Sequence, residues 1–167
     1  MKKLIKLSCL FLFVSLMTTS CSNDDDGAAE ENFSDTIEYK EDIVDITSSR
    51  IEDYKGENGY YNYDFILSGK SDSDVSYVFY VELFSKGTES FKTGTFKYIS
   101  ETSSESADFY YGYAFLNVDD ETLNVKAGDI TVSGSGSNYS ISGVLTLTND
   151  EVLNISYSGE FTVVDGE

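Results

Sequence analysis

The residue types that could do chemistry in this chain are carboxylates, hydroxyls and amines, because the sequence contains no histidine. Without histidine, a Ser-His-Asp or Cys-His nucleophile system and the usual zinc and non-haem iron sites are excluded. The two cysteines, Cys9 and Cys21, both lie near the N-terminus, so residues 22–167 offer no thiolate. Catalysis would depend on Asp, Glu, Lys, Tyr or Ser, and a bound metal would be a hard cation such as calcium.

The carboxylates are abundant but form no motif. A glycosidase needs two of them on facing structure at a defined separation. The 30 Asp and Glu residues supply many pairs without singling one out. Calcium could bind at the acidic segments 72–74 and 119–121, but neither follows the ligand spacing of an EF-hand loop. We therefore predict no catalytic residue, no cofactor and no metal site.

Three tyrosines, Tyr60, Tyr80 and Tyr110, form the one candidate ligand platform. Each lies opposite the more apolar face of its expected strand, so the three rings could share an outward face of a sheet. A surface of aromatic rings could stack on the apolar faces of sugars, and the tyrosine hydroxyls could form hydrogen bonds. The chain has no tryptophan, which weakens this interpretation. Cross-strand tyrosine pairs also stabilise sheets without any ligand, so both interpretations stay open.

The elements that must position these residues are strands. From Ile43 onward, apolar and polar residues alternate with a period of two, which is typical of half-buried antiparallel strands. One face of each clear strand carries the large apolar side chains and is expected to be buried. These faces are Tyr61, Tyr63, Phe65 and Leu67; Val75, Tyr77, Phe79, Val81 and Leu83; Phe109, Tyr111, Tyr113 and Phe115; Tyr139, Ile141, Leu145 and Leu147; and Leu153, Ile155, Tyr157, Phe161 and Val163.

Weaker strands near residues 43–54, 92–99 and 125–133 bring the expected number to about eight, with no amphipathic helix between them. Turn chemistry separates the strands: TNDE at 148–151 predicts a hairpin, and SGSGSN at 133–138 predicts another turn. The predicted fold class is all-β, a single antiparallel domain of about eight strands, built as a β-sandwich or an up-and-down barrel.

The first 20 residues have the order of a secretory signal peptide. Lysines at positions 2, 3 and 6 precede a mainly apolar run over residues 7–17, and small polar residues follow at 18–20. The apolar run has about half the roughly 20 residues that a membrane-spanning helix requires. We therefore expect residues 1–20 to be removed.

The pair Ser20-Cys21 resembles the lipobox of bacterial lipoproteins, in which the cysteine becomes the lipid-carrying first residue of the mature chain. Thr18 stands where the usual lipobox has leucine, so ordinary cleavage after residues 18–20 is the alternative. That alternative would leave Cys21 as an unpaired thiol in an oxidising compartment, which is unusual. Lipidation of Cys21 is the better interpretation.

The residues CSNDDD also resemble the start of lipoproteins from Bacteroidota. In that group an acidic cluster just after the lipidated cysteine resembles the signal for export to the outer face of the outer membrane. The matching residues are Asp24, Asp25 and Asp26. The resemblance implies a protein anchored to the outer membrane through its lipid and facing the cell surface. A run of like charges is also typical of a solvated, disordered linker, and both interpretations can hold together.

The net charge of the chain limits the classes of partner that it can bind. Without residues 1–20, which carry three lysines and no acidic residue, 8 basic and 30 acidic residues remain, so the formal charge is −22. Phosphate backbones are bound through Lys and Arg, so nucleic acid is excluded as a partner. An anionic membrane surface is equally unfavourable, which leaves the lipid as the means of membrane attachment.

The expected organisation is a signal peptide over 1–20, an acidic disordered tether over 21–35 and an all-β domain over 36–167. The expected function is that of a non-catalytic binding or assembly module whose ligand is a glycan or a protein. Two alternatives stay open. One is a carboxylate-dependent glycan-active enzyme, and the other is a carrier of a small apolar ligand, if the strands enclose an open barrel.

Overall fold

The computed structural model describes residues 34–100, 103 and 105–167, so Cys21 and the cluster of Asp24, Asp25 and Asp26 lie outside the described residues. In the described part of the chain, no helix has the length and apolar character needed to cross a membrane. The described elements are all strands: β1 (Thr36–Tyr39), β2 (Asp42–Glu57), β3 (Tyr60–Lys70), β4 (Ser76–Lys86), β5 (Gly94–Tyr98), β6 (Phe109–Tyr111), β7 (Ala114–Val118), β8 (Glu121–Ser135), β9 (Asn138–Leu147), β10 (Val152–Glu160) and β11 (Thr162–Asp165).

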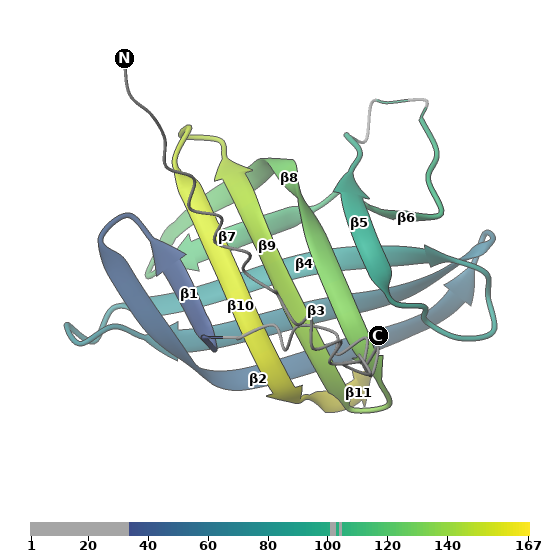
Figure 1. The fold of residues 1–167 in the computed structure, drawn as a ribbon, viewed down its shortest axis with the longest axis horizontal. Coiled ribbons are helices and arrows are strands. Elements are labelled where there is room, and N and C mark those ends of the chain that lie inside the picture. The colour runs from purple at the N-terminus through teal and green to yellow at the C-terminus, as the bar shows by residue number, and fades with distance from the viewer. Residues whose placement is uncertain (1–33, 101–102, 104) are drawn as a thin grey trace, which may run out of the picture. The chain divides into compact units, whose positions relative to one another are not determined.

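The strands form one sheet whose pairing closes on itself (Figure 1). Because β1 pairs with both β10 and β2, the sequence of neighbours β1, β2, β3, β4, β7, β8, β9, β10 returns to its start. Every pairing in this ring is antiparallel. Figure 1 shows β2, β3 and β4 crossing behind β8, β9 and β10, and the buried side chains of both groups form one hydrophobic core.

The all-β prediction is confirmed, but the prediction of about eight strands in a purely antiparallel sheet is wrong. The sheet has eleven strands among the described residues and is mixed, because β5 pairs with β6 in parallel and β11 pairs with β2 in parallel. β6 has three residues and β11 has four. Segments this short hold too few alternating positions for a period of two to be recognised in the sequence.

Side chains fill the interior of the sheet. The predicted inward faces of residues 61–67, 75–83 and 139–147 are confirmed, with Phe65, Phe79 and Ile141 fully buried. Aromatic rings pack there in series: Phe65 lies 5.3 Å from Phe161, centroid to centroid, and Phe91 lies 5.6 Å from Phe96. The buried side chains inside the sheet belong to one hydrophobic core.

The predicted inward face of residues 109–115 is only half correct. Tyr111 is buried, but Tyr113 is 41% exposed and Phe115 lies on the outer face, while Ala114 and Leu116 point inward. The reason is an extra residue between β6 and β7. Phe84 of β4 lies opposite Tyr110, and Val81 of β4 lies opposite Ala114. Between these two pairs the chain advances three residues along β4 but four residues from β6 to β7. One extra residue reverses the alternation that follows it.

The C-terminal prediction also needs one correction. Leu153, Ile155 and Phe161 are buried as expected, but Val163 is 40% exposed. β10 pairs with β9 as far as Glu160, and after Phe161 the chain continues as β11, which pairs with β2. The alternation of inward and outward residues in β10 therefore does not continue into β11. All four residues of β11 are exposed.

Both predicted turns are confirmed. Thr146 pairs with Val152 across the TNDE turn, where Asp150 adopts a positive φ of 68°. Ser135 pairs with Asn138 across a two-residue connection in which Gly136 has the same φ. A positive φ costs glycine little and is tolerated by aspartate, which explains the turn composition.

Residues 34 and 35, which precede β1, are hydrogen-bonded to neighbouring strands. Asp35 accepts a hydrogen bond from the Ser158 amide at 2.8 Å, and its carbonyl accepts one from the Ile46 amide at 2.9 Å. The Ser34 amide donates to Ser156 Oγ at 3.1 Å. These two residues therefore already bridge β10 and β2 ahead of β1.

Candidate functional site

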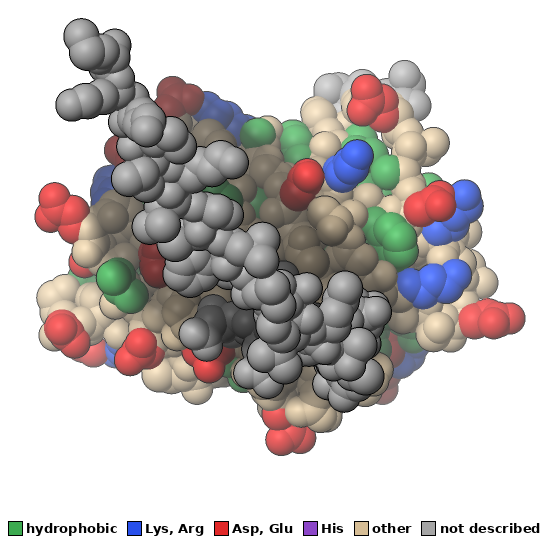
Figure 2. Space-filling model, in the orientation of Figure 1, with side chains coloured by type: hydrophobic (Ala, Val, Ile, Leu, Met, Phe, Trp, Pro, Cys, Tyr) green, Lys and Arg blue, Asp and Glu red, His purple; other side chains and the backbone are tan. Residues whose placement is uncertain are grey.

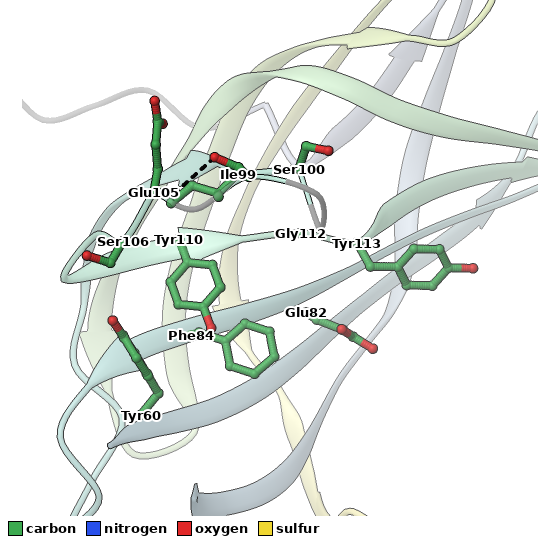
Figure 3. Close-up of a pocket in the computed structure, with 11 residues that line it drawn as sticks. Tyr60, Glu82, Phe84, Ile99, Ser100, Glu105, Ser106, Tyr110, Gly112 and Tyr113 are labelled. Carbon is green, nitrogen blue, oxygen red and sulfur yellow. Dashed lines mark hydrogen bonds between the residues drawn. The ribbon is translucent and has the colours of Figure 1, made fainter. Parts of the chain in front are cut away.

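Aromatic rings gather on the outer face of β3, β4 and β6. Tyr60, Phe84 and Tyr110 lie there because each occupies an outward position of its strand, and Phe84 is the direct register partner of Tyr110. Phe84 stacks on Tyr110 with centroids 5.0 Å apart and planes at 14°. Tyr60 meets Tyr110 edge-on at 5.1 Å and 89°. We call these three residues the aromatic ridge, and Figure 3 shows their side chains grouped together.

Two hollows flank the ridge and share all three of its residues. The first has a volume of about 520 Å³ and is lined further by Glu82 of β4, by Tyr113 at the bulge and by Ile99, Ser100, Ser103, Glu105 and Ser106. The second has a volume of about 310 Å³ and is lined further by residues of the β2–β3 hairpin, among them Tyr54, Lys55 and Asn62. In Figure 3, Glu82 lies between the ridge and Tyr113.

Of the three tyrosines predicted to form a platform, the structure brings two together. Tyr60 and Tyr110 belong to the ridge, whereas Tyr80 lines neither hollow. Tyr80 occupies the same face of β4 as Phe84 but stacks on Phe115 at 4.9 Å and contacts Tyr113 at 5.9 Å. The outward aromatic side chains therefore form two neighbouring groups.

Three carboxylates lie side by side on the same outer face. Glu52 of β2 is the register partner of Asp64 of β3, and Asp64 is the register partner of Glu82 of β4. We call them the carboxylate row. Like charges directly opposite each other destabilise a sheet, so this arrangement needs compensation. Part of it is supplied by Arg50, which pairs with Glu52 at 2.7 Å.

Asp64, in the centre of the row, is only 2% exposed. The Tyr80 hydroxyl donates a hydrogen bond to its carboxylate, and the Asn62 side-chain amide donates another at 3.1 Å. Burial raises the pKa of Asp64 to about 6, and the charges of Glu82 and Glu52 act in the same direction. Burial and the bond to Asp64 likewise raise the pKa of Tyr80. The hydrogen bond to the buried Asp64 carboxylate therefore accounts for the position of Tyr80.

Two basic residues near the ridge are held by carboxylates. Lys55, in the second hollow, lies 2.7 Å from Asp53 and 2.8 Å from Asp165, and these bonds raise its pKa. Lys86, which follows Phe84 on the same face of β4, lies 2.7 Å from Asp108. On the face seen in Figure 2, acidic side chains are spread over the surface with basic ones between them.

The two acidic turns considered for calcium have other partners. Asp74 pairs with Lys70 at 2.8 Å, and Asp119 accepts a hydrogen bond from the Ser76 amide at 2.9 Å. Among the described residues, no three Asp or Glu side chains are placed to hold a metal ion together. These aspartates act as turn residues, consistent with the positive φ of Asp74 and Asp119.

Sequence reasoning missed Phe84, Glu82 and Tyr113. Phe84 and Glu82 carried a usable signal, because they share the face of their strand with Tyr80. Tyr113 carried none, because its outward direction depends on the extra residue opposite β4.

Comparison of the chain with protein-family models, with curated proteins and with solved structures finds no match in any of the three. The functional inference therefore depends on the ridge, its hollows and the groups that surround them.

Proposed function

We propose that this protein is a non-catalytic binding module, anchored to the outer membrane through a lipid on Cys21 and facing the cell surface. Its binding site is the aromatic ridge of Tyr60, Phe84 and Tyr110 with the two hollows beside it. Its ligand is an extended chain that lies across the ridge and reaches into both hollows.

The observation that carries this proposal is the shared ridge. The hollows, at about 520 and 310 Å³, fall in the lower part of the size range of ligand sites, and they border each other along three aromatic side chains. Aromatic rings provide large contact areas at a low cost in conformational entropy, which favours them as anchors. A compact ligand would use one hollow, whereas an extended one gains contact from both.

Binding is favoured over catalysis by the exposure of the acidic groups. Glu82 and Glu105 both line the first hollow, so two carboxylates are present there. Glu105 is exposed and Glu82 is only half-buried. A general acid needs a raised pKa, which burial provides, and Asp64, whose pKa is raised, lines neither hollow.

The binding site is tested by screening the full chain, purified in mild detergent, against a panel of neutral oligosaccharides and extended peptides. The double variant Phe84→Ala/Tyr110→Ala should weaken the binding of any captured ligand by about tenfold or more, as expected for central aromatic anchors. Val144→Ala, on the outer face of β9, is the matched control and should leave affinity unchanged. Binding that is indifferent to the ridge variant, or no binding across the panel, would overturn the proposal.

The anchor is tested separately in a bacterial host that processes lipoproteins. Metabolic labelling with a fatty acid should mark the parent protein and leave Cys21→Ser unlabelled. Replacing Asp24, Asp25 and Asp26 by Asn should keep the label but reduce digestion of the protein by protease added to intact cells. Labelling of Cys21→Ser would contradict lipidation at this residue, and unchanged protease access would contradict the export role of the aspartates.

A further inference from the structure

We infer that the first hollow binds the positively charged side chain, arginine or lysine, of an extended peptide segment. This inference rests on the proposed function and specifies the chemistry of its ligand. Three features of the hollow support it: the angles between its rings, its carboxylates and the absence of basic residues among the described residues of its lining.

The rings form a corner, which suits a cation better than a flat sugar. Tyr60 stands at 89° to Tyr110, and one face each of Phe84 and Tyr110 is already covered by the other ring. A sugar stacks best on an open, flat ring, whereas a cation gains from several rings that surround it at different angles. Tyr113 adds a fourth aromatic side chain to the lining.

The charged residues described in the lining of the first hollow are all acidic. Glu82 and Glu105 line the first hollow, and neither Lys nor Arg is among the residues described there. Glu82 also ends the carboxylate row, in which Asp64 is its direct neighbour and Glu52, next in the row, is paired with Arg50.

Two of the described lysines near the first hollow are engaged by other carboxylates. Lys86 is engaged by Asp108 and Lys55 by Asp53 and Asp165. Lys97, the register partner of Tyr110 on β5, is exposed and does not line the hollow.

The net negative charge of the rest of the chain strengthens the preference of the hollow for a cationic ligand. The formal charge of −22 calculated for residues 21–167 repels anionic ligands and attracts cationic ones before contact is made. A peptide also meets the requirement for an extended ligand, since its neighbouring residues can cross the ridge toward the second hollow. There, the side-chain oxygen of Asn62 can accept a hydrogen bond, while its amide nitrogen donates to Asp64 and to the Leu83 carbonyl.

The test uses three blocked octapeptides of Gly and Ser that differ only at a central Arg, Gln or Glu, together with a neutral β-linked glucose hexamer. Affinities for the full chain in mild detergent are measured by calorimetry at low and high salt. The Arg peptide should bind about fivefold or more tightly than the Gln peptide, and the difference should shrink at high salt.

Glu82→Gln, which keeps the size and an acceptor oxygen, should remove most of this difference. Glu52→Gln is the matched control, because it removes the same charge from the same row but does not line the first hollow. It should keep the preference for Arg. An equal loss in both variants would show attraction to the general charge only and would overturn the inference.

The remaining outcomes separate the inference from the proposed function. Equal binding of the Arg and Gln peptides, or binding of the glucose hexamer alone, overturns the inference while the proposed function stands, provided that Phe84→Ala weakens that binding. Binding that Phe84→Ala leaves unchanged overturns both.

Discussion

The outer side of β8, β9 and β10 carries many small polar side chains, whereas the outer side of β3, β4, β6 and β7 carries aromatic rings. On the first surface, Ser140 and Ser158 face each other with hydroxyls 2.7 Å apart, and Val144 and Val152 are exposed apolar residues at 68% and 50%. On the second, Phe84 and Tyr80 each stack on a neighbouring ring. We refer to these as the serine face and the aromatic face.

The serine face has what an antiparallel sheet requires, whereas the aromatic face has features beyond that requirement. An antiparallel sheet with one buried face needs only polar residues on the other, and the serine face meets that requirement. The aromatic face instead places rings and a row of three carboxylates where small polar residues would suffice. Departures from local rules are expected at functional sites, which directs attention to this face.

The largest expected effect concerns pH and the buried carboxylate of the aromatic face. The pKa of Asp64, about 6, is raised above the ordinary value of 3.8 that applies to the unfolded chain. The folded protein therefore holds this proton more tightly. Its contribution to stability is complete below about pH 4 and is lost as pH rises through about 6. By this group alone, the free energy of unfolding should fall by up to about 3 kcal/mol over that interval.

Asp64→Asn should remove this part of the pH dependence, as measured by urea unfolding at several pH values between about 4 and 7. Asp129→Asn changes an exposed aspartate next to the serine face and should keep the slope of the parent protein. Equal slopes for Asp64→Asn and the parent protein would show that Asp64 titrates as an ordinary exposed group.

A smaller effect is expected from the hydroxyl that supports Asp64. Tyr80→Phe removes the donor to a buried carboxylate, so the free energy of unfolding at pH 7 should fall by about 1–3 kcal/mol. The matched change beside the serine face is Tyr157→Phe, whose hydroxyl lies 2.9 Å from Ser49 Oγ near the surface. It should cost less than about 1 kcal/mol. Equal losses in urea unfolding would remove the contrast between the two tyrosines.

The smallest effect is expected from truncating the ridge itself. Phe84 is half-buried, so Phe84→Ala should lower the free energy of unfolding by about 1–2 kcal/mol. Val144→Ala on the serine face should change it by less than about 0.5 kcal/mol. A loss of about 3–5 kcal/mol for Phe84→Ala would be that of a core aromatic residue and would assign the ridge to folding rather than to binding.

Prediction from the sequence succeeded where a single strand carries the information. A period of two identifies the inward face of residues 75–83 without knowledge of the partner strands, because burial acts on every second residue. The hairpin at 148–151 was equally predictable, since aspartate and asparagine tolerate the backbone angles of a turn. The exclusion of histidine and thiol chemistry within residues 22–167 follows from composition alone.

Prediction failed where the outcome depends on a partner strand. The outward direction of Tyr113 and Phe115 follows from one extra residue opposite β4, and a bulge of this kind leaves no mark in the alternation itself. The carboxylate row is similar: Glu52, Asp64 and Glu82 are unremarkable in a chain with 30 acidic residues until strand register aligns them.

The sequence by itself determined an all-β chain with alternating faces, a strongly negative charge and no histidine or thiol chemistry within residues 22–167. These properties come from composition and from near neighbours along the chain. Only the tertiary structure decided that Tyr60 and Tyr110 meet beside Phe84, that Tyr80 serves a buried carboxylate, and that the sheet closes through β1. Each of these depends on the register between paired strands, which packing of the common core selects.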